Sequence, residues 1–495
     1  MMMFRRLVLV VAVVTATPEL AQIHVITRHG SRTSLQKQSG GSGGRLVEQK
    51  TGAILTALGE KQLYDLGDWL RERYAVDNRL LVENYQPHLV HFQSSDLERT
   101  ISSANALTAG LYPPTRRSES GLLPSNIYPS IPVYMEDDRN DIYIRAYNKC
   151  PKFNRALKDL YDTTEWTTLE QEHHFLLDKV GTIEEFNQFK NKATGKIPLR
   201  ELWNVFDAIN VAKTECVYDT NEVSCANVFS AIDDDAWTAL KKLAHKAEMM
   251  RYSTAGDLLG ANLMLQIHQR MGGGFFSFAD HVTGFRKLYH YSAHYPTILS
   301  LFSALNIPPP DDEVIPGYGA AFIFELYKDI TTGITSIKLL YKEANAEEAV
   351  TIQFPQGPCF SAFAECDLPN FTQLLKGLDI SSPADWCAAC ENDSADVCLA
   401  AAGQQQQQPA AAPTVVAASP ANNLQLQQQQ ETSPQTTSCA STILGALFGG
   451  IGLGMLFLLL LQIYMSKRNG QKEVTDADSI SPDNMIDLDF TDIII

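Results

Sequence analysis

Arginine and histidine side chains gather in short segments of this chain that each follow a run of strand-forming residues. The first segment, 28–33, reads Arg-His-Gly-Ser-Arg-Thr and follows the run 23–27. A second, 94–100, contains Arg99, and a third, 292–294, ends at His294. Ligands of open α/β sheets bind outside the carboxyl ends of the strands, so we expect these side chains to meet. Guanidinium groups can bind two oxygen atoms of a phosphate at once, which predicts an anion site.

The histidine of the first segment has an environment suited to nucleophilic chemistry. Arg28 and Arg32 would place positive charge beside His29, and that charge disfavours the imidazolium form. His29 could therefore stay neutral and nucleophilic at mildly acid pH. Gly30 permits a close backbone approach. A single segment of this kind could be a basic surface turn, but similar groups at three strand ends favour a site.

The elements that must position these side chains alternate between strand and helix patterns. Strand-like runs occur at 23–27, 89–93, 288–291, 322–327 and 337–341, and helical spacing occurs at 56–74, from 97, and after 294. Residues 150–250 lack strand signals, and a buried helix face is indicated by Leu202, Val205, Phe206 and Ile209. The pattern predicts an α/β fold: a mixed sheet flanked by helices, interrupted by a mainly α-helical insert at about 115–250.

Length and charge narrow the class of protein further. The chain has 495 residues, too many for one ordinary domain. It carries 40 Lys and Arg residues against 57 Asp and Glu, a net charge of −17. A nucleic-acid partner is therefore not expected, because phosphate contacts along a nucleic acid need a basic face.

Three unusual segments predict a single-pass type I membrane protein. Residues 1–16 resemble a secretory signal peptide, with an uncleaved anchor or a buried strand as the alternatives. Residues 443–461 carry no charge and would span about 28 Å as a helix, and Lys467 and Arg468 follow. We predict a transmembrane helix at 443–465, a low-complexity Gln/Pro/Ser/Thr stalk at 399–442, a cytoplasmic acidic tail at 466–495, and a lumenal or extracellular domain at 17–398.

The membrane segment and the tail suggest partners besides the bilayer. Gly445, Gly449, Gly450 and Gly454 form two GxxxG pairs that could allow a homodimer, although glycine is common in such helices. The tail places aspartates beside bulky apolar residues and ends at Ile495. It could bind trafficking adaptors or be a plain solvated tail.

Cysteines and sequons are consistent with a lumenal domain. In an oxidising compartment we expect disulfides among the cysteines of this domain, namely Cys150, Cys216, Cys225, Cys359, Cys366, Cys387, Cys390 and Cys398. Cys216 with Cys225, and Cys359 with Cys366, are close enough in sequence to close small loops. The Cys387–Cys390 spacing also fits a redox or zinc pair, a weaker alternative. Asn370 and Asn392 lie in glycosylation sequons.

In combination, these segments resemble the histidine acid phosphatase family. Residues 28–32 resemble its RHGxR signature, the segment from Ser95 to Thr100 resembles its second site segment, and 291–294 resembles its C-terminal histidine motif. The helix signal at 55–71, Cys150-Pro151 and 324–327 match further landmarks, so the likeness covers roughly 21–390. With one anchor and a short tail, the chain is similar to a membrane-bound, lysosomal-type acid phosphatase.

The resemblance implies an acid phosphatase that cleaves phosphate monoesters in an endosomal, lysosomal or cell-surface membrane. His29 would attack phosphorus and form a phosphohistidine, while His294 adds a hydrogen bond to the phosphoryl group. Arg28, Arg32 and Arg99 would bind the phosphoryl oxygens. No metal or cofactor is expected, because the arginines supply the positive charge.

The chain departs from the family pattern at position 295. The family usually has an acidic residue directly after the second histidine, as proton donor to the leaving alcohol, whereas this chain has Tyr295. Either Tyr295 donates weakly, or another carboxylate or a water serves, or activity is reduced. Alternatives to the hydrolase are therefore a phosphate- or phospholipid-binding receptor, and a trafficking or adhesion protein that uses the fold as a scaffold.

Overall fold

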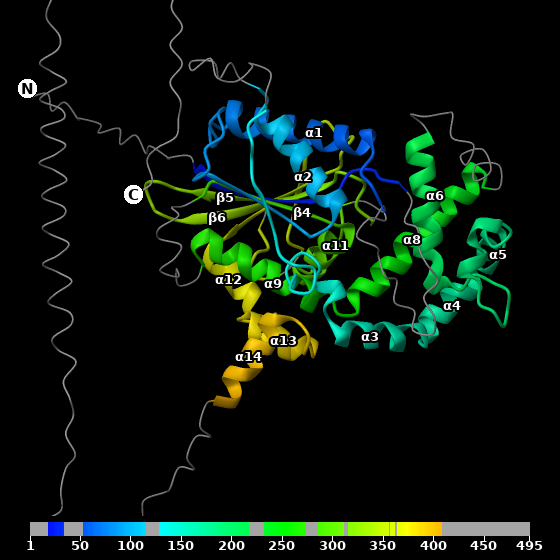
Figure 1. The fold of residues 1–495 in the computed structure, drawn as a ribbon. Coiled ribbons are helices and arrows are strands. Elements are labelled where there is room, and N and C mark those ends of the chain that lie inside the picture. Colours follow the sequence, from blue (N-terminus) through cyan, green and yellow to red (C-terminus); the bar gives the residue numbers. More distant parts are fainter. Residues whose placement is uncertain are drawn as a thin grey trace, which may run out of the picture. The chain divides into compact units, whose positions relative to one another are not determined.

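The computed structural model describes residues 18–33, 53–114, 128–216, 232–273, 286–310, 315–355, 357–361 and 364–407 (Figure 1). All of them belong to one compact unit, Met1–Ala410. The predicted signal peptide, transmembrane helix and cytoplasmic tail lie outside the described residues. Among the helices of the described ranges, none combines the length and apolar character needed to cross a bilayer.

A mixed sheet forms the centre of the unit. Its strands lie in the order β3-β2-β4-β1-β5-β6-β7, with β8 paired to β6. Neighbours from β3 to β1 are parallel, and those from β1 to β8 are antiparallel. The strands are β1 Glu19–Arg28, β2 Val90–Ser94, β3 Val133–Met135, β4 Leu288–Ala293, β5 Ala321–Lys328, β6 Thr335–Lys342, β7 Val350–Ile352 and β8 Glu365–Asp367.

Helices cover both faces of this sheet (Figure 1). Helices α1 Ala57–Arg71 and α2 Glu98–Leu111 pack against Ile23 and Val25 on one face. Helices α9 Gly256–His268, α11 Tyr295–Ala304 and α12 Leu368–Lys376 lie on the other face, where Phe322 and Phe324 are fully buried. The alternation of β1 side chains between the two cores follows from the two-residue period of a strand.

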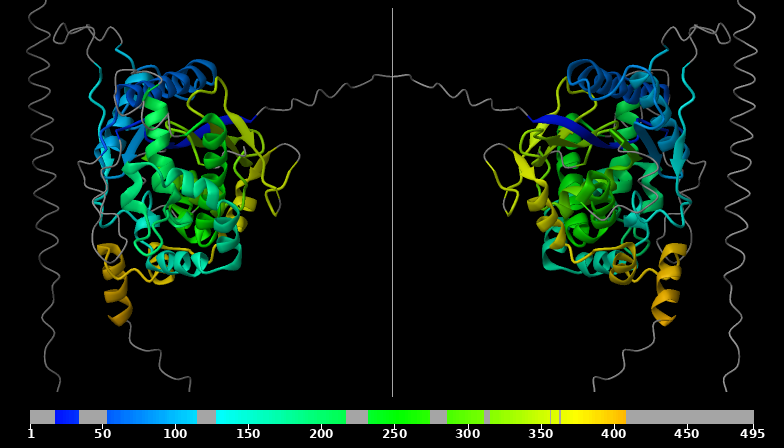
Figure 2. Two further views of the ribbon diagram at one scale, coloured as in Figure 1. Left: turned by 90° about the vertical axis from the view of Figure 1, so that its right-hand side faces the viewer. Right: turned by 90° about the vertical axis from the view of Figure 1, so that its left-hand side faces the viewer.

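The helical insert lies between β3 and β4 in the sequence and beside the sheet in Figure 1, and its helices lie in front of the sheet in the left view of Figure 2. Its α-helices within the described ranges are α3 Pro151–Tyr161, α4 Thr164–Glu172, α5 His174–Val180, α6 Leu202–Cys216 and α8 Asp234–Ser253, before α9 returns to the sheet. The apolar stripe predicted in α6 is buried in a core that also contains Trp166 and Leu240. An α/β fold with a helix-flanked mixed sheet is thus confirmed.

The element boundaries differ from the sequence-based ones in two places. Strand β3, parallel to β2, falls within the predicted insert, whose last helix α8 ends at Ser253. Helix α14, Asp396–Gln407, extends into the segment predicted as stalk. A three-residue edge strand and a glutamine run that continues a helix both carry weak local signals.

Three disulfides are present in the described residues, and one of them connects the end of the described chain to the start of the insert helices. Cys150, just before α3, pairs with Cys390 of helix α13, Pro383–Cys390, and Cys387 pairs with Cys398 of α14. The predicted bond between Cys359 and Cys366 is present. Cys387 and Cys390 therefore have different partners and do not form a redox or zinc pair. Cys225 lies outside the described residues, so its predicted pairing with Cys216 stays a prediction.

The two sequon asparagines differ in their surroundings. Asn370 is half-buried on α12. Asn392 is only 7% exposed, and its amide nitrogen donates to the Lys149 carbonyl at 2.6 Å. Its Oδ1 accepts from the backbone N–H groups of Ser394 and Ala395 at 2.9 and 3.0 Å. The Asn392 side chain thus stabilises the turn that precedes α14, and glycosylation at either sequon stays a prediction.

Candidate active site

The carboxyl ends of β1, β2 and β4 meet at one edge of the sheet. Arg28 pairs with Ala293 across β1 and β4, and Ser94 pairs with Ser292 across β2 and β4. The register continues past the strands, because the backbone N–H of His29 donates to the Ala293 carbonyl at 3.0 Å. As a result the predicted segments are neighbours, and the ring centroids of His29 and His294 lie 5.4 Å apart, edge to face.

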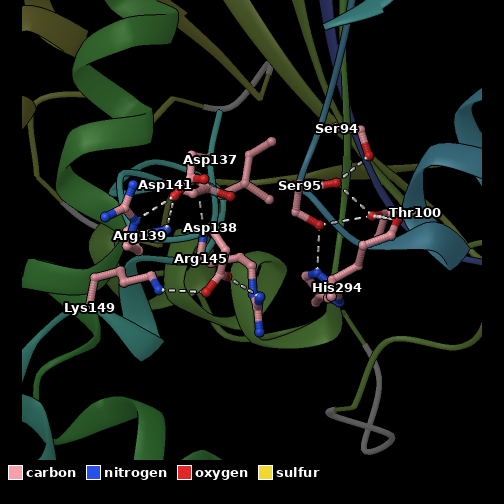
Figure 3. Close-up of polar contacts among 12 residues, drawn as sticks. Ser94, Ser95, Thr100, Asp137, Asp138, Arg139, Asp141, Arg145, Lys149 and His294 are labelled. Atoms are coloured by element: carbon pink, nitrogen blue, oxygen red, sulfur yellow. Dashed lines mark hydrogen bonds and ion pairs between the residues drawn. The ribbon is translucent and has the colours of Figure 1, made fainter. Parts of the chain in front are cut away.

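Hydrogen bonds hold both histidines. His29 Nδ1 lies 2.8 Å from the Gly30 carbonyl, which can only accept, so Nδ1 carries a proton and Nε2 has the lone pair. His294 Nε2 lies 2.9 Å from Ser95 Oγ (Figure 3). The backbone of Gly30 touches Gly59 of α1, where a Cβ atom on Gly30 would meet the Gly59 carbonyl at 2.2 Å. The close approach that Gly30 permits is therefore to α1.

The environment keeps His29 uncharged. Its side chain is 3% exposed, and burial lowers its pKa well below the usual value. The charges of Arg99, His294, Arg32 and Arg28 lower this pKa further. The sequence analysis expected the arginines to disfavour the imidazolium form, and in the structure burial is the larger of the two causes. A buried neutral imidazole with a lone pair on Nε2 is a nucleophile at acid pH.

The arginines of the motifs converge on the same place. Arg28, Arg32 and Arg99 are each 5% exposed or less, and each lowers the pKa of both His29 and His294. The Arg28 guanidinium donates to the Pro316 carbonyl at 2.6 Å and stacks on the Tyr318 ring, with its Cζ 3.9 Å from the ring centroid. These cations form a buried positive cluster at the strand ends, an arrangement that can bind an anion.

Helix α6 of the insert forms one wall of this site. Asp207 accepts from Arg32 Nη2 with both carboxylate oxygens, at 2.8 and 2.9 Å. Two turns later, Glu215 accepts from Thr56 Oγ1 at 2.8 Å and from Ser31 Oγ. Both carboxylates thus contact the first motif or the residue that caps α1, and they join the insert to the sheet.

Comparisons with known proteins agree with this geometry. The histidine phosphatase superfamily (branch 2) profile matches residues 44–342, more than half of the chain. The chain belongs to the histidine phosphatase superfamily, branch 2. The family resemblance inferred from the motifs is confirmed, although the matched span begins after the first motif.

Individual relatives of this histidine phosphatase are acid phosphatases, and phytases share its fold. The chain is 26% identical to the lysosomal acid phosphatase of Xenopus laevis, over 78% of this chain and 83% of that protein. It is 26% identical to the prostatic acid phosphatase of Rattus norvegicus, over 76% and 90%. Its fold matches the apo phytase of Hafnia alvei with a TM-score of 0.55 at 17% identity, over 74% and 98%.

Tyr295, the uncertain proton donor, lies beside the site with its hydroxyl bound to the insert. Its ring centroid is 5.3 Å from Arg28 Cζ. Its hydroxyl donates to Glu248 Oε2 at 3.0 Å, and the other oxygen of Glu248 accepts from Arg251 at 2.5 Å. Burial and the charge of Glu248 raise the pKa of Tyr295 well above its usual value. The phenol therefore keeps its proton and directs it to Glu248 of α8.

Sequence reasoning missed several residues of this histidine phosphatase site. Asp207 lies outside the apolar stripe that identified α6, and Tyr318 comes from a loop with no distinctive pattern. Arg145 lies near enough to lower the pKa of His294, and it pairs with Asp138, which also accepts from Lys149 at 3.1 Å (Figure 3). Within the described ranges, no three histidine, cysteine or acidic side chains gather in a metal-binding group.

Proposed function

We propose that this chain hydrolyses phosphate monoesters at acidic pH through a phosphohistidine at His29. The observation that carries the proposal is the neutral His29 ring, with its Nδ1 proton fixed by the Gly30 carbonyl, among Arg28, Arg32 and Arg99. Membership in the histidine phosphatase superfamily and the acid phosphatase relatives support phosphoric monoester hydrolysis.

The proposed reaction has two steps. In the first, the lone pair of His29 Nε2 forms a bond to phosphorus, and the bond from phosphorus to the alcohol oxygen breaks. In the second, water attacks phosphorus and the N–P bond breaks, which returns neutral His29 and releases inorganic phosphate. The arginines stabilise the charge on the phosphoryl oxygens in both transition states. His294, fixed by Ser95, supplies a further hydrogen bond to the same group.

The proposed setting is the lumenal or extracellular side of a membrane. Support comes from the sequence of 1–16 and 443–465, and from the disulfides of the described domain, which are typical of oxidising compartments. The lysosomal acid phosphatases among the relatives favour a lysosomal or secretory route. Truncation before Ala440 should release a soluble enzyme with unchanged kinetics. A truncated protein that stays in the membrane pellet after carbonate washing would contradict this topology.

The decisive experiment is hydrolysis of an aryl phosphate at about pH 5 by the wild type and by His29→Ala. We expect turnover in the wild type alone, together with an acid-labile phosphoprotein that the variant lacks. The variant should still fold, since removal of one imidazole ring leaves the strand β1 and its hydrogen bonds in place. Retention of more than a trace of activity by His29→Ala would show that His29 is not the nucleophile.

A second candidate is a phosphate-binding protein with weakened catalysis. The observation that favours it is the bond from Tyr295 to Glu248, which engages the proton of the residue at the usual donor position. Isothermal calorimetry with inorganic phosphate separates the two. Binding without turnover of aryl phosphates would support the second candidate.

A further inference from the structure

The alcohol of an ordinary alkyl phosphate leaves phosphorus slowly unless the bridging oxygen receives a proton. An alkoxide is a strong base, whereas a nitrophenolate leaves readily without help. The Tyr295 hydroxyl already donates to Glu248, whose second oxygen is paired with Arg251. Both oxygens of that carboxylate are therefore already engaged, one by the Tyr295 hydroxyl and the other by Arg251. If the enzyme uses alkyl phosphates, the proton comes from another group at the strand ends.

Two carboxylates of α6 contact this edge of the sheet, and they differ in their partners. Glu215 binds the hydroxyls of Ser31 and Thr56. Asp207 binds the Arg32 guanidinium, one of the groups that would hold the phosphoryl oxygens. Two acceptors on one guanidinium lie a few ångströms apart, within reach of a proton transfer. Asp207 is also 7% exposed, so bulk water does not surround it.

We infer that Asp207 is the proton donor for this enzyme, acting from the insert in place of an acid at position 295. The inference rests on the proposed function. As His29 Nε2 bonds to phosphorus, the P–O bond breaks toward the alcohol oxygen, and that oxygen takes the proton of the Asp207 carboxyl. In the second step the Asp207 carboxylate takes a proton from the attacking water, so the acid is restored.

Substrate binding itself supplies the protonated form of Asp207. In the free enzyme the Arg32 guanidinium favours the carboxylate. A bound phosphoryl group shares that guanidinium and brings negative charge next to Asp207, and both changes favour the protonated carboxyl. Tyr295 and Tyr318 also respond to the Asp207 charge, and each keeps its proton because burial raises its pKa. Arg28 adds positive charge beside the Tyr318 ring, with its Cζ 3.9 Å from the ring centroid.

The test compares leaving groups in the full-length protein. Turnover of 4-nitrophenyl phosphate and glycerol 2-phosphate is measured at about pH 5 for the wild type, Asp207→Asn and Asp207→Glu. Asparagine keeps the shape and a hydrogen bond to Arg32 but cannot donate a carboxyl proton. We expect Asp207→Asn to lower kcat on glycerol 2-phosphate by about 10²–10⁴-fold and on 4-nitrophenyl phosphate by less than about tenfold. Asp207→Glu should retain most of the alkyl-phosphate turnover that Asp207→Asn loses.

Glu325→Gln is the matched control. Glu325 is also a buried carboxylate bound to an arginine, Arg73, but it makes no contact with the strand-end residues described above. The ratio of alkyl to aryl turnover should stay at the wild-type value in this variant. Binding of inorganic phosphate gives a second readout that does not depend on turnover. In buffers of different ionisation enthalpy, the wild type should take up more protons on binding than Asp207→Asn does.

Each other outcome overturns the inference. An equal loss on both substrates with a raised KM would mean that Asp207 only positions Arg32. A selective alkyl-phosphate loss in Tyr318→Phe, with none in Asp207→Asn, would assign the proton to Tyr318. A wild type that cleaves only the aryl ester has no working donor, and the proposed function stands without Asp207. A wild type that cleaves neither ester contradicts the proposed function itself.

Discussion

Two buried clusters of charged and aromatic side chains lie along the strands β1 and β5, and they differ in how their charges are balanced. In one, Glu325 of β5 accepts hydrogen bonds from Arg73, Tyr74 and Tyr327, so that one carboxylate serves all three neighbours. In the other, at the strand ends, several arginines surround His29 and their charges lower its pKa. The first cluster is locally compensated, and the second maintains a positive field at a neutral ring.

This difference separates a stabilising role from a binding role. A compensated buried pair gains nothing from an outside anion, whereas breaking it leaves a buried charge without its partner. A positive field at a buried neutral ring costs stability but attracts a phosphate and stabilises the charge of a transition state. Substitutions in the two clusters should therefore have opposite consequences: lost activity in one and lost stability in the other.

The largest effect is expected for Arg99→Met at the site. Arg99 is a proposed donor to the phosphoryl group, and its removal should lower kcat/KM by about 10²–10³-fold. Arg99 also lowers the pKa of His29, so its removal raises that pKa. Because the neutral ring is the proposed nucleophile, the acid limb of the pH–rate profile should move to higher pH. Steady-state kinetics from about pH 4 to 7 measure both effects.

Arg99→Lys is the control for this first prediction. Lysine keeps the positive charge, so the acid limb should remain near its wild-type position, although the loss of the planar fork still lowers kcat/KM. If the acid limb stays unchanged in Arg99→Met as well, the field of this arginine does not reach His29 and the contrast between the clusters fails.

The next effect is expected for Glu325→Gln in the compensated cluster. The variant leaves the Arg73 charge with a neutral partner in a mostly buried position and should lower the free energy of unfolding by about 3 kcal/mol. Activity at a temperature where the variant is folded should stay within about twofold of the wild type. Urea unfolding tests the predicted loss of stability, and steady-state kinetics test the predicted unchanged activity. A large drop in kcat in the folded variant would show that this cluster contributes to the site.

The strand-end residues could be predicted from the sequence because local patterns determine where strands end. Parallel pairing then brings those ends to one edge, which places His29, Ser95 and His294 together. The contacts of the insert could not be predicted in this way. Asp207 and Arg32 are 175 positions apart, and the helical period of α6 shows which face is apolar but not what the polar face meets.

The disulfides and the contact of Tyr295 show the same limit of prediction from sequence. The bond from Cys359 to Cys366 closes a short loop and could be predicted from spacing, whereas Cys150 and Cys390 are 240 positions apart. The Tyr295 departure was visible in the sequence, but its partner Glu248 comes from another helix. Long-range pairs depend on how the insert folds back on the sheet, and single-sequence periodicity carries no information about that.

The smallest effect concerns the pH dependence of stability, at a buried histidine of β4. His290 of β4 is fully buried, and its Nε2 lies 3.0 Å from Thr27 Oγ1. Burial lowers its pKa to about 3. The unfolded chain takes up a proton near pH 6.5, whereas the folded protein does not do so until about pH 3. His290 therefore leaves stability unchanged above about pH 6.5 and lowers it as the pH falls, by at most about 1.4 kcal/mol per pH unit.

His290→Gln removes this titration and keeps an amide that can bond to Thr27. Urea unfolding of the wild type and the variant at about pH 6.5 and pH 4.5 gives two differences in the free energy of unfolding. The variant should lose about 2–3 kcal/mol less than the wild type between these two pH values, because it has one fewer proton to take up on unfolding. His24, His29 and His294 remain in both proteins, and since burial lowers the pKa of each, a common acid slope persists. Parallel losses in the two proteins would mean that His290 is already protonated in the fold, in which case Thr27 must accept its proton and the sheet interior must tolerate a cation.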